Sequence, residues 1–110
     1  MSATFSLDST EFIAFNGGPH FKFTPAISLF ITVKTQAEID HFWKKLSAGG
    51  KPQQCGWVQD KFGLCWQVVP DCLQDMLMDN NEAKASRAMD AMLKMKKIDI
   101  AKLKKAHAGK

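Results

Sequence analysis

Alternating apolar and polar residues mark three stretches of the chain as β-strands. The strongest alternation covers residues 26–34, where every second residue from Ile27 to Val33 is aliphatic. Residues 64–69 alternate in the same way and end at Pro70, which cannot continue a strand ladder. Residues 4–15 hold two shorter runs around Asp8-Ser9-Thr10, a sequence typical of a turn, and therefore predict a β-hairpin.

Apolar residues at helical spacing predict one helix between the strands and further helices after them. Thr35 and Glu38 form a capping-box pattern, and apolar residues then recur from Ile39 to Leu46 before two glycines end the helix. After Pro70 the expected helix starts are Asp71, the pair Asp79 and Glu82, and Asp99. A methionine-rich stripe follows the second of these starts and is typical of core or interface packing.

The stretch from Cys55 to Pro70 is predicted to organise the sheet. A strand over residues 52–59 leads into a turn at residues 60–63, and residues 64–69 return as the last strand. Gln67 lies in the middle of that strand among apolar neighbours, and burying its amide without a partner costs roughly 1–3 kcal/mol. Gln67 therefore either faces a wet cavity or bonds a specific group.

Composition limits the chain to one domain and excludes several classes of protein. Its 110 residues are 45% hydrophobic, and none of its apolar runs approaches the ~20 residues of a membrane span. The first residues lack the features of a secretory signal, so we expect a cytoplasmic protein that has no membrane partner and holds its three cysteines reduced. The cysteines contain no CxxC pair, which argues against a zinc site.

The positive charge is concentrated at the C-terminal end. The chain has a formal charge of +4, and residues 94–110 hold seven lysines and one aspartate. The remainder, with eight basic and ten acidic residues, is slightly acidic. This distribution is typical of a solvated basic tail, and we expect no nucleic-acid partner.

Three blocks of sequence resemble one known family. NGGPHFKFTPAISLF, CGWVQDKFGLCWQVVP and AMLKMKKIDIAKL occur in this order and are similar to the PhnB-like branch of the vicinal oxygen chelate superfamily. That superfamily includes glyoxalase I, extradiol dioxygenases (the dihydroxybiphenyl dioxygenases among them) and bleomycin-resistance proteins, and members of this branch are also labelled 3-demethylubiquinone-9 3-methyltransferase. The resemblance implies an α+β fold, a glyoxalase-like βαβββ half-barrel with a mostly antiparallel, curled sheet and C-terminal helices.

The resemblance also suggests how the single domain of residues 1–110 is divided. Residues 1–25 correspond to a hairpin and linker, residues 26–70 to a βαββ module, and residues 71–110 to the C-terminal helices. The opening strand and helix of the family's first module have no counterpart before Met1, so we expect the chain to lack that part. We further expect a homodimer in which each chain completes the half-barrel of the other.

The superfamily's metal enzymes imply ligand positions that this chain fills with poor ligands. Those positions correspond to Ser28, Gln67 and the neighbourhood of Ala14, whereas divalent metals favour His and Glu. We therefore expect no metal and no other cofactor. The expected ligand-binding pocket comprises Asn16, His20, Ser28, Phe30, Trp57, Cys65 and Gln67.

Several functions are compatible with these features. The first is metal-independent binding of a small organic molecule in a pocket formed by a dimer. The alternatives are a divalent-metal-dependent glyoxalase- or dioxygenase-like enzyme and a dimerising half-module with a vestigial pocket. A methyltransferase is disfavoured, because Gly17-Gly18-Pro19 does not open a helix as a nucleotide-binding glycine turn does. The sequence identifies no catalytic residue and favours a protein that is not an enzyme.

Overall fold

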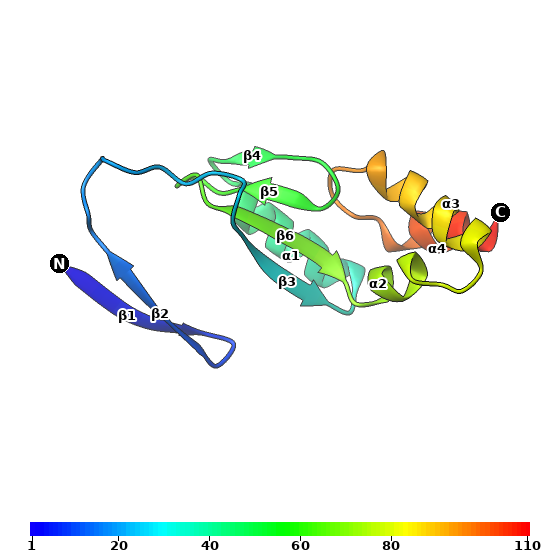
Figure 1. Cartoon of the computed structure of the whole chain (residues 1–110), viewed down its shortest axis with the longest axis horizontal. Helices are drawn as coiled ribbons and strands as arrows, with labels where there is room; N and C mark the ends of the chain where they lie inside the picture. Colours follow the sequence, from blue (N-terminus) through cyan, green and yellow to red (C-terminus); the bar gives the residue numbers. More distant parts are fainter.

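A computed structural model describes residues 1–110 and shows an N-terminal arm, a four-stranded sheet and a C-terminal helical unit (Figure 1). The strands are β1 (Ser2–Leu7), β2 (Thr10–Phe15), β3 (Ser28–Val33), β4 (Lys51–Pro52), β5 (Trp57–Gln59) and β6 (Cys65–Pro70). The helices are α1 (Gln36–Ser47), α2 (Cys72–Leu77), α3 (Glu82–Leu93) and α4 (Ile100–Ala108). The predicted α+β class is confirmed, and the sheet stays open rather than closing into a barrel.

The order of strands in the main sheet is β3-β6-β5-β4, so the last strand lies between the first and the third. β6 pairs in parallel with β3 and antiparallel with β5, while β4 and β5 are antiparallel. Gln67 in β6 lies opposite Phe30 on one side and Trp57 on the other. Because strand side chains alternate between faces, these three side chains share one face of the sheet.

The opposite face of the sheet is covered by α1 (Figure 1). The predicted capping box is present, since the Thr35 hydroxyl accepts from the Glu38 backbone N–H at 3.2 Å and the Glu38 carboxylate accepts from the Thr35 N–H at 3.1 Å. Ile39 on the helix and Val58 and Val68 on the strands are completely buried. This face therefore contains the core that the apolar spacing predicted.

The strand expected over residues 52–59 is interrupted between β4 and β5. Cys55 and Gly56 both have positive φ, at 60° and 83°, and leave the ladder. Their backbone N–H groups donate to the carbonyls of Met95 and Lys96, each at 2.8 Å. The interruption therefore attaches the C-terminal segment to the sheet, which local sequence could not reveal.

A second attachment holds the C-terminal segment against the start of α1. The Gln36 side-chain amide donates to the Ile98 carbonyl at 3.0 Å and accepts from the Ile100 N–H at 2.8 Å. The Ile98 side chain is fully buried. The buried residues that join the helical unit to the sheet are Val69, Leu73, Met76, Ala88, Ile98 and Leu103.

The caps of the C-terminal helices agree with the sequence only in part. Asp99 caps α4 as expected, accepting from the Lys102 N–H at 3.1 Å. Asn81, rather than the expected Asp79 and Glu82, provides the cap of α3. Asp71 precedes α2 but makes no capping hydrogen bond, so its carboxylate remains free for other contacts.

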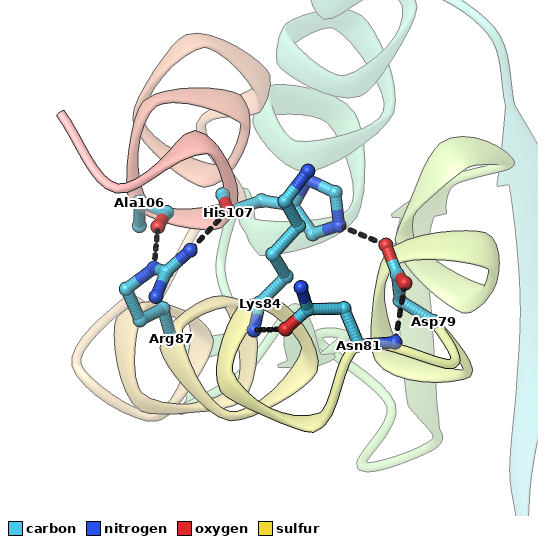
Figure 2. A network of polar contacts seen from close by, with 6 residues as sticks. All are labelled: Asp79, Asn81, Lys84, Arg87, Ala106 and His107. Atoms are coloured by element: carbon cyan, nitrogen blue, oxygen red, sulfur yellow. Dashed lines mark hydrogen bonds and ion pairs between the residues drawn. The ribbon is translucent and has the colours of Figure 1, made fainter.

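A polar network joins the two ends of the helical unit (Figure 2). His107 Nε2 on α4 lies 2.8 Å from Asp79 Oδ2, which precedes α3. Arg87 on α3 donates to the carbonyls of Ala106 and His107, each at 3.0 Å. The Ala106 carbonyl also accepts from the Gly109 N–H at 3.0 Å, so the guanidinium adds donors to the last carbonyls of α4.

Acid is expected to weaken this network through Asp79. The Asn81 N–H, and after it His107, lowers the pKa of the Asp79 carboxyl from its ordinary 3.8. A lowered folded-state pKa adds stability above the unfolded pKa, and this stability is lost as the pH falls below about 3.8. Urea unfolding at pH 6 and pH 3 should show a smaller loss of stability on acidification for Asp79→Asn than for the unchanged protein.

The matched control for this measurement is Asp75→Asn on α2, because the Asp75 carboxylate is exposed and makes no ion pair. Its acid dependence should follow that of the unchanged protein. An Asp79→Asn variant that loses as much stability between pH 6 and pH 3 as the unchanged protein would contradict the assignment.

The N-terminal arm, residues 1–27, extends away from the rest of the molecule (Figure 1). β1 and β2 form the predicted hairpin, in which Phe5 and Phe12 are partners and stack with ring centroids 5.5 Å apart. Ile13 is 67% exposed and Phe21 94% exposed. The radius of gyration is 16.1 Å, whereas about 13 Å is expected for a compact chain of this length. The arm therefore contributes little to the chain's own core.

Candidate functional site

A cavity of about 400 Å³ lies between the face of the sheet opposite α1 and the helices α2 and α3. The sheet contributes Phe30, Thr32, Trp57, Gln67 and Val69 to its walls. The other lining residues are Cys55, Pro70, Asp71, Leu73, Gln74, Leu77, Met78 and Met92. Apolar and aromatic walls with a few polar groups are the usual lining of a small-molecule site.

The main polar feature of the sheet wall is a pair formed by Gln67 and Ser28. Gln67 Nε2 donates to Ser28 Oγ at 3.0 Å across the parallel β3–β6 pair. This bond answers the question that the sequence left open, because it gives the mid-strand amide a partner. The Gln67 carbonyl oxygen remains able to accept, and the Ser28 hydroxyl hydrogen remains able to donate.

The expected pocket residues fall into three groups. Phe30, Trp57 and Gln67 line the cavity, and Ser28 adjoins it through its bond to Gln67. Cys65 shares their face of the sheet but is fully buried, with its thiol 3.9 Å from Gln53 Oε1. Asn16 and His20, the other two expected residues, are exposed on the N-terminal arm and do not line the cavity.

The residues that sequence reasoning missed come mostly from the helical wall. Thr32 and Val69 could have been included, because they continue the alternation that places Phe30 and Gln67 on one face. Leu73 and Met92 reach the cavity only because the C-terminal segment folds back over the end of the sheet. The apolar spacing within each helix does not specify that arrangement.

Asp71 is the charged residue of the cavity wall. Its backbone N–H donates to the Val33 carbonyl at 2.8 Å, which fixes the start of α2 at the end of the sheet. The carboxylate forms neither a capping hydrogen bond nor an ion pair. Lysine, arginine and histidine are absent from the lining.

The positions implied for a divalent metal do not fit one. Ser28 and Gln67 bond to each other, and Ala14 lies on β2 of the arm, which is separate from the main sheet. The structure contains no group of three or more His, Cys, Asp or Glu side chains that could share a metal ion. The amides of Gln67 and Gln74 and the hydroxyls at the cavity bind transition metals weakly. The stronger donors in the lining, Cys55 and Asp71, have no third His, Cys, Asp or Glu beside them to complete a site.

A second groove, about 620 Å³, separates the hairpin from the main body. Leu7 and Phe12 of the arm line one side, and Phe42 and Trp66 line the other. β3 runs along this groove and pairs only with β6, so its outer edge is unpaired. The arm thus lies next to the free edge without forming a ladder with it.

Comparison with known families gives a match over the arm and the sheet. The family model described as 3-demethylubiquinone-9 3-methyltransferase matches residues 1–69, more than half of the chain. The chain belongs to this PhnB-like family. The matched region ends just before Pro70, so it contains the sheet wall of the cavity but not α2 or α3.

A solved structure supports membership of the PhnB-like family. The chain is similar to a putative 3-demethylubiquinone-9 3-methyltransferase, a PhnB protein from Bacillus cereus, with 35% sequence identity and a TM-score of 0.57. The similarity covers 64% of each chain, so this PhnB-like chain matches less than two thirds of the length of that protein. No curated protein matches the chain. None of the helices in this family member is long and apolar enough to cross a membrane.

Proposed function

We propose that this PhnB-like protein binds a small organic molecule without the help of a metal ion. The observation that carries the proposal is the cavity of about 400 Å³ above Phe30, Trp57 and Gln67. Its size lies within the range of known ligand pockets, roughly 300–1,000 Å³. The aromatic side chains supply apolar contact area, and the Gln67–Ser28 pair supplies one acceptor and one donor.

Metal independence is proposed from the chemistry of the residues. At the two sheet positions where the superfamily's metal enzymes supply ligands, this chain has a hydroxyl and an amide that already bond to each other at 3.0 Å. A metal-dependent glyoxalase- or dioxygenase-like reaction would need stronger ligands from elsewhere. The cavity therefore favours a binding protein over such an enzyme.

The methyltransferase named in the family description receives no support from the glycine-rich segment. Gly17 and Gly18 lie on the exposed arm, and the next element is the strand β3 rather than a helix. A nucleotide-type methyl donor is usually bound where a glycine turn opens a helix. The proposal therefore does not include methyl transfer.

A second copy of the chain is proposed to enclose the cavity. The arm presents apolar side chains to solvent, and the outer edge of β3 has no partner within the chain. A two-fold partner can cover both features with the same surfaces on each chain. In such a homodimer, parts of the partner protomer would complete the wall around a ligand held between the sheet and α2 of one chain.

We also place the protein in the cytoplasm, because its cysteines Cys55, Cys65 and Cys72 are all free thiols. Finding the mature protein outside the cell, with these cysteines oxidised, would contradict this assignment.

Binding can be tested with a neutral aromatic probe, 3-phenylpropan-1-ol, added to protein treated with a metal chelator. A probe of about ten heavy atoms at about 0.3 kcal/mol per atom should bind in the millimolar range. We expect saturable shifts of the Trp57 indole N–H in NMR spectra, because Trp57 lines the cavity. Adding zinc or nickel should leave the dissociation constant unchanged.

The specificity control fills the cavity without disturbing its core. Thr32 lines the cavity and is exposed, so Thr32→Trp should abolish the shift while Thr32→Ala retains it. If neither the neutral probe nor its charged analogues bind at 10 mM, the proposed function is wrong. A tenfold gain in affinity on adding a metal would instead favour the metal-dependent alternative.

A further inference from the structure

The charge of the cavity differs from that of the whole chain. The protein has a formal charge of +4, yet the Asp71 carboxylate is the charged group in the lining. That carboxylate makes no capping hydrogen bond and no ion pair, so its acceptor capacity is available. A bound molecule near it therefore meets a net negative charge.

The Asp71 carboxylate forms no ion pair with a nearby cation. Burial raises the pKa of the neighbouring Cys72 thiol; the charge of Lys104 opposes this shift, and the charges of Asp71 and Asp75 add to it. Lys104 is nevertheless outside the lining and does not form an ion pair with Asp71. Asp75 on α2 adds a second negative charge close to the same helix start.

The walls of the cavity are also suited to a positive ligand. Trp57 and Phe30 present aromatic rings, which attract cations to their faces. Met78 and Met92 supply polarisable thioethers that adapt to apolar groups of varied shape. The Gln67 oxygen offers a further acceptor for an N–H group.

We propose that the ligand is a hydrophobic amine bound as its cation, with the ammonium at Asp71 and the apolar body between the sheet and α2. This inference rests on the proposed function, because it names the ligand class of the same cavity. Asp71 is exposed at the cavity mouth, so an ammonium there retains part of its hydration while its apolar body is buried.

The test compares three probes of nearly the same shape: 3-phenylpropan-1-aminium, 3-phenylpropan-1-ol and 3-phenylpropanoate. Their dissociation constants are measured by NMR titration at low salt, following the indole N–H of Trp57. The cation is expected to bind at least threefold more tightly than the alcohol, and the anion at least threefold more weakly. High salt should reduce both differences, because exposed charges are screened.

Two variants separate the role of Asp71 from general electrostatics. Asp71→Asn keeps a residue that suits a helix start but removes the charge, and it should abolish the preference for the cation over the alcohol. Asp75→Asn makes the same change on α2 outside the lining and should retain the preference.

Three other results of these titrations would each contradict one of the claims made above. Equal affinities for the cation and the alcohol, both detected at Trp57, would overturn the amine inference and leave the proposed binding function intact. Cation-induced shifts at Trp66 instead would place the amine in the groove beside the arm and overturn the assignment to this cavity. Failure of all three probes to bind would refute the proposed function itself.

Discussion

Replacing Gly50 with alanine is expected to reduce the free energy of unfolding by about 3 kcal/mol or more. Gly50 lies directly before β4, where the chain passes close to the end of β5. A Cβ atom at Gly50 would be 2.1 Å from the Gln59 carbonyl oxygen and 2.8 Å from the Asp60 carbonyl carbon. Both atoms belong to the backbone, so the clash can be relieved only by moving the β4–β5 pair.

Thermal unfolding measured by circular dichroism gives the test, with Gly17→Ala as the control. At position 17 a Cβ would meet only the flexible Phe15 ring, at 3.3 Å, so this change should be within about 0.5 kcal/mol of neutral. For a domain of this size, 3 kcal/mol corresponds to a fall in melting temperature of roughly 12 °C or more. Equal melting temperatures for the two variants would show that the β4–β5 pair is not packed as described.

Sedimentation equilibrium at low micromolar concentration is expected to give the mass of a homodimer. The apolar arm has few partners in its own chain, and obligate dimers generally bury at least ~2,000 Å² of largely apolar surface. Because folding and association are then coupled, the melting temperature should fall when the protein is diluted. A monomer with a melting temperature independent of dilution would contradict the proposed dimer.

The role of the arm can be isolated with substitutions on β2. Replacing both Ile13 and Phe15 with lysine removes exposed apolar surface from the hairpin and should shift the equilibrium to monomer. Glu11→Lys changes the charge of the same strand without removing apolar surface and should remain dimeric. If the double variant still sediments as a dimer, the protomers associate through another surface.

The sheet and the first helix could be predicted because their signals are local. Alternation in residues 26–34 and 64–69 predicted the strands that the structure places at Ser28–Val33 and Cys65–Pro70, and the Thr35–Glu38 pair identified the start of α1. The break between β4 and β5 could not be predicted, because the Cys55 and Gly56 N–H groups bond to carbonyls about 40 residues later in the chain.

The residues of the candidate site on the strands could likewise be predicted from local sequence, whereas those on its helical side could not. Alternation indicated which face of its own strand carries Phe30 or Gln67, and the family resemblance implied that both lie with Trp57 in one pocket. Asp71 was seen only as a possible helix cap, and its place in the cavity depends on how α2 leaves β6. The sequence alone therefore could not show that the Asp71 carboxylate, which suggests the ligand class, lies in the cavity wall.

The central position of β6 has a consequence for folding during synthesis. β6 is the last strand of the main sheet to be made, yet β3 and β5 pair with it rather than with each other. At a synthesis rate of about 5–20 residues per second, roughly 2–7 s pass between the synthesis of β3 and that of its partner β6. Phe21 and the other exposed side chains of the arm remain uncovered throughout that time and beyond it. The nascent chain is therefore expected to depend on chaperones until β6 has paired with β3 and β5, and the proposed pairing of protomers would follow.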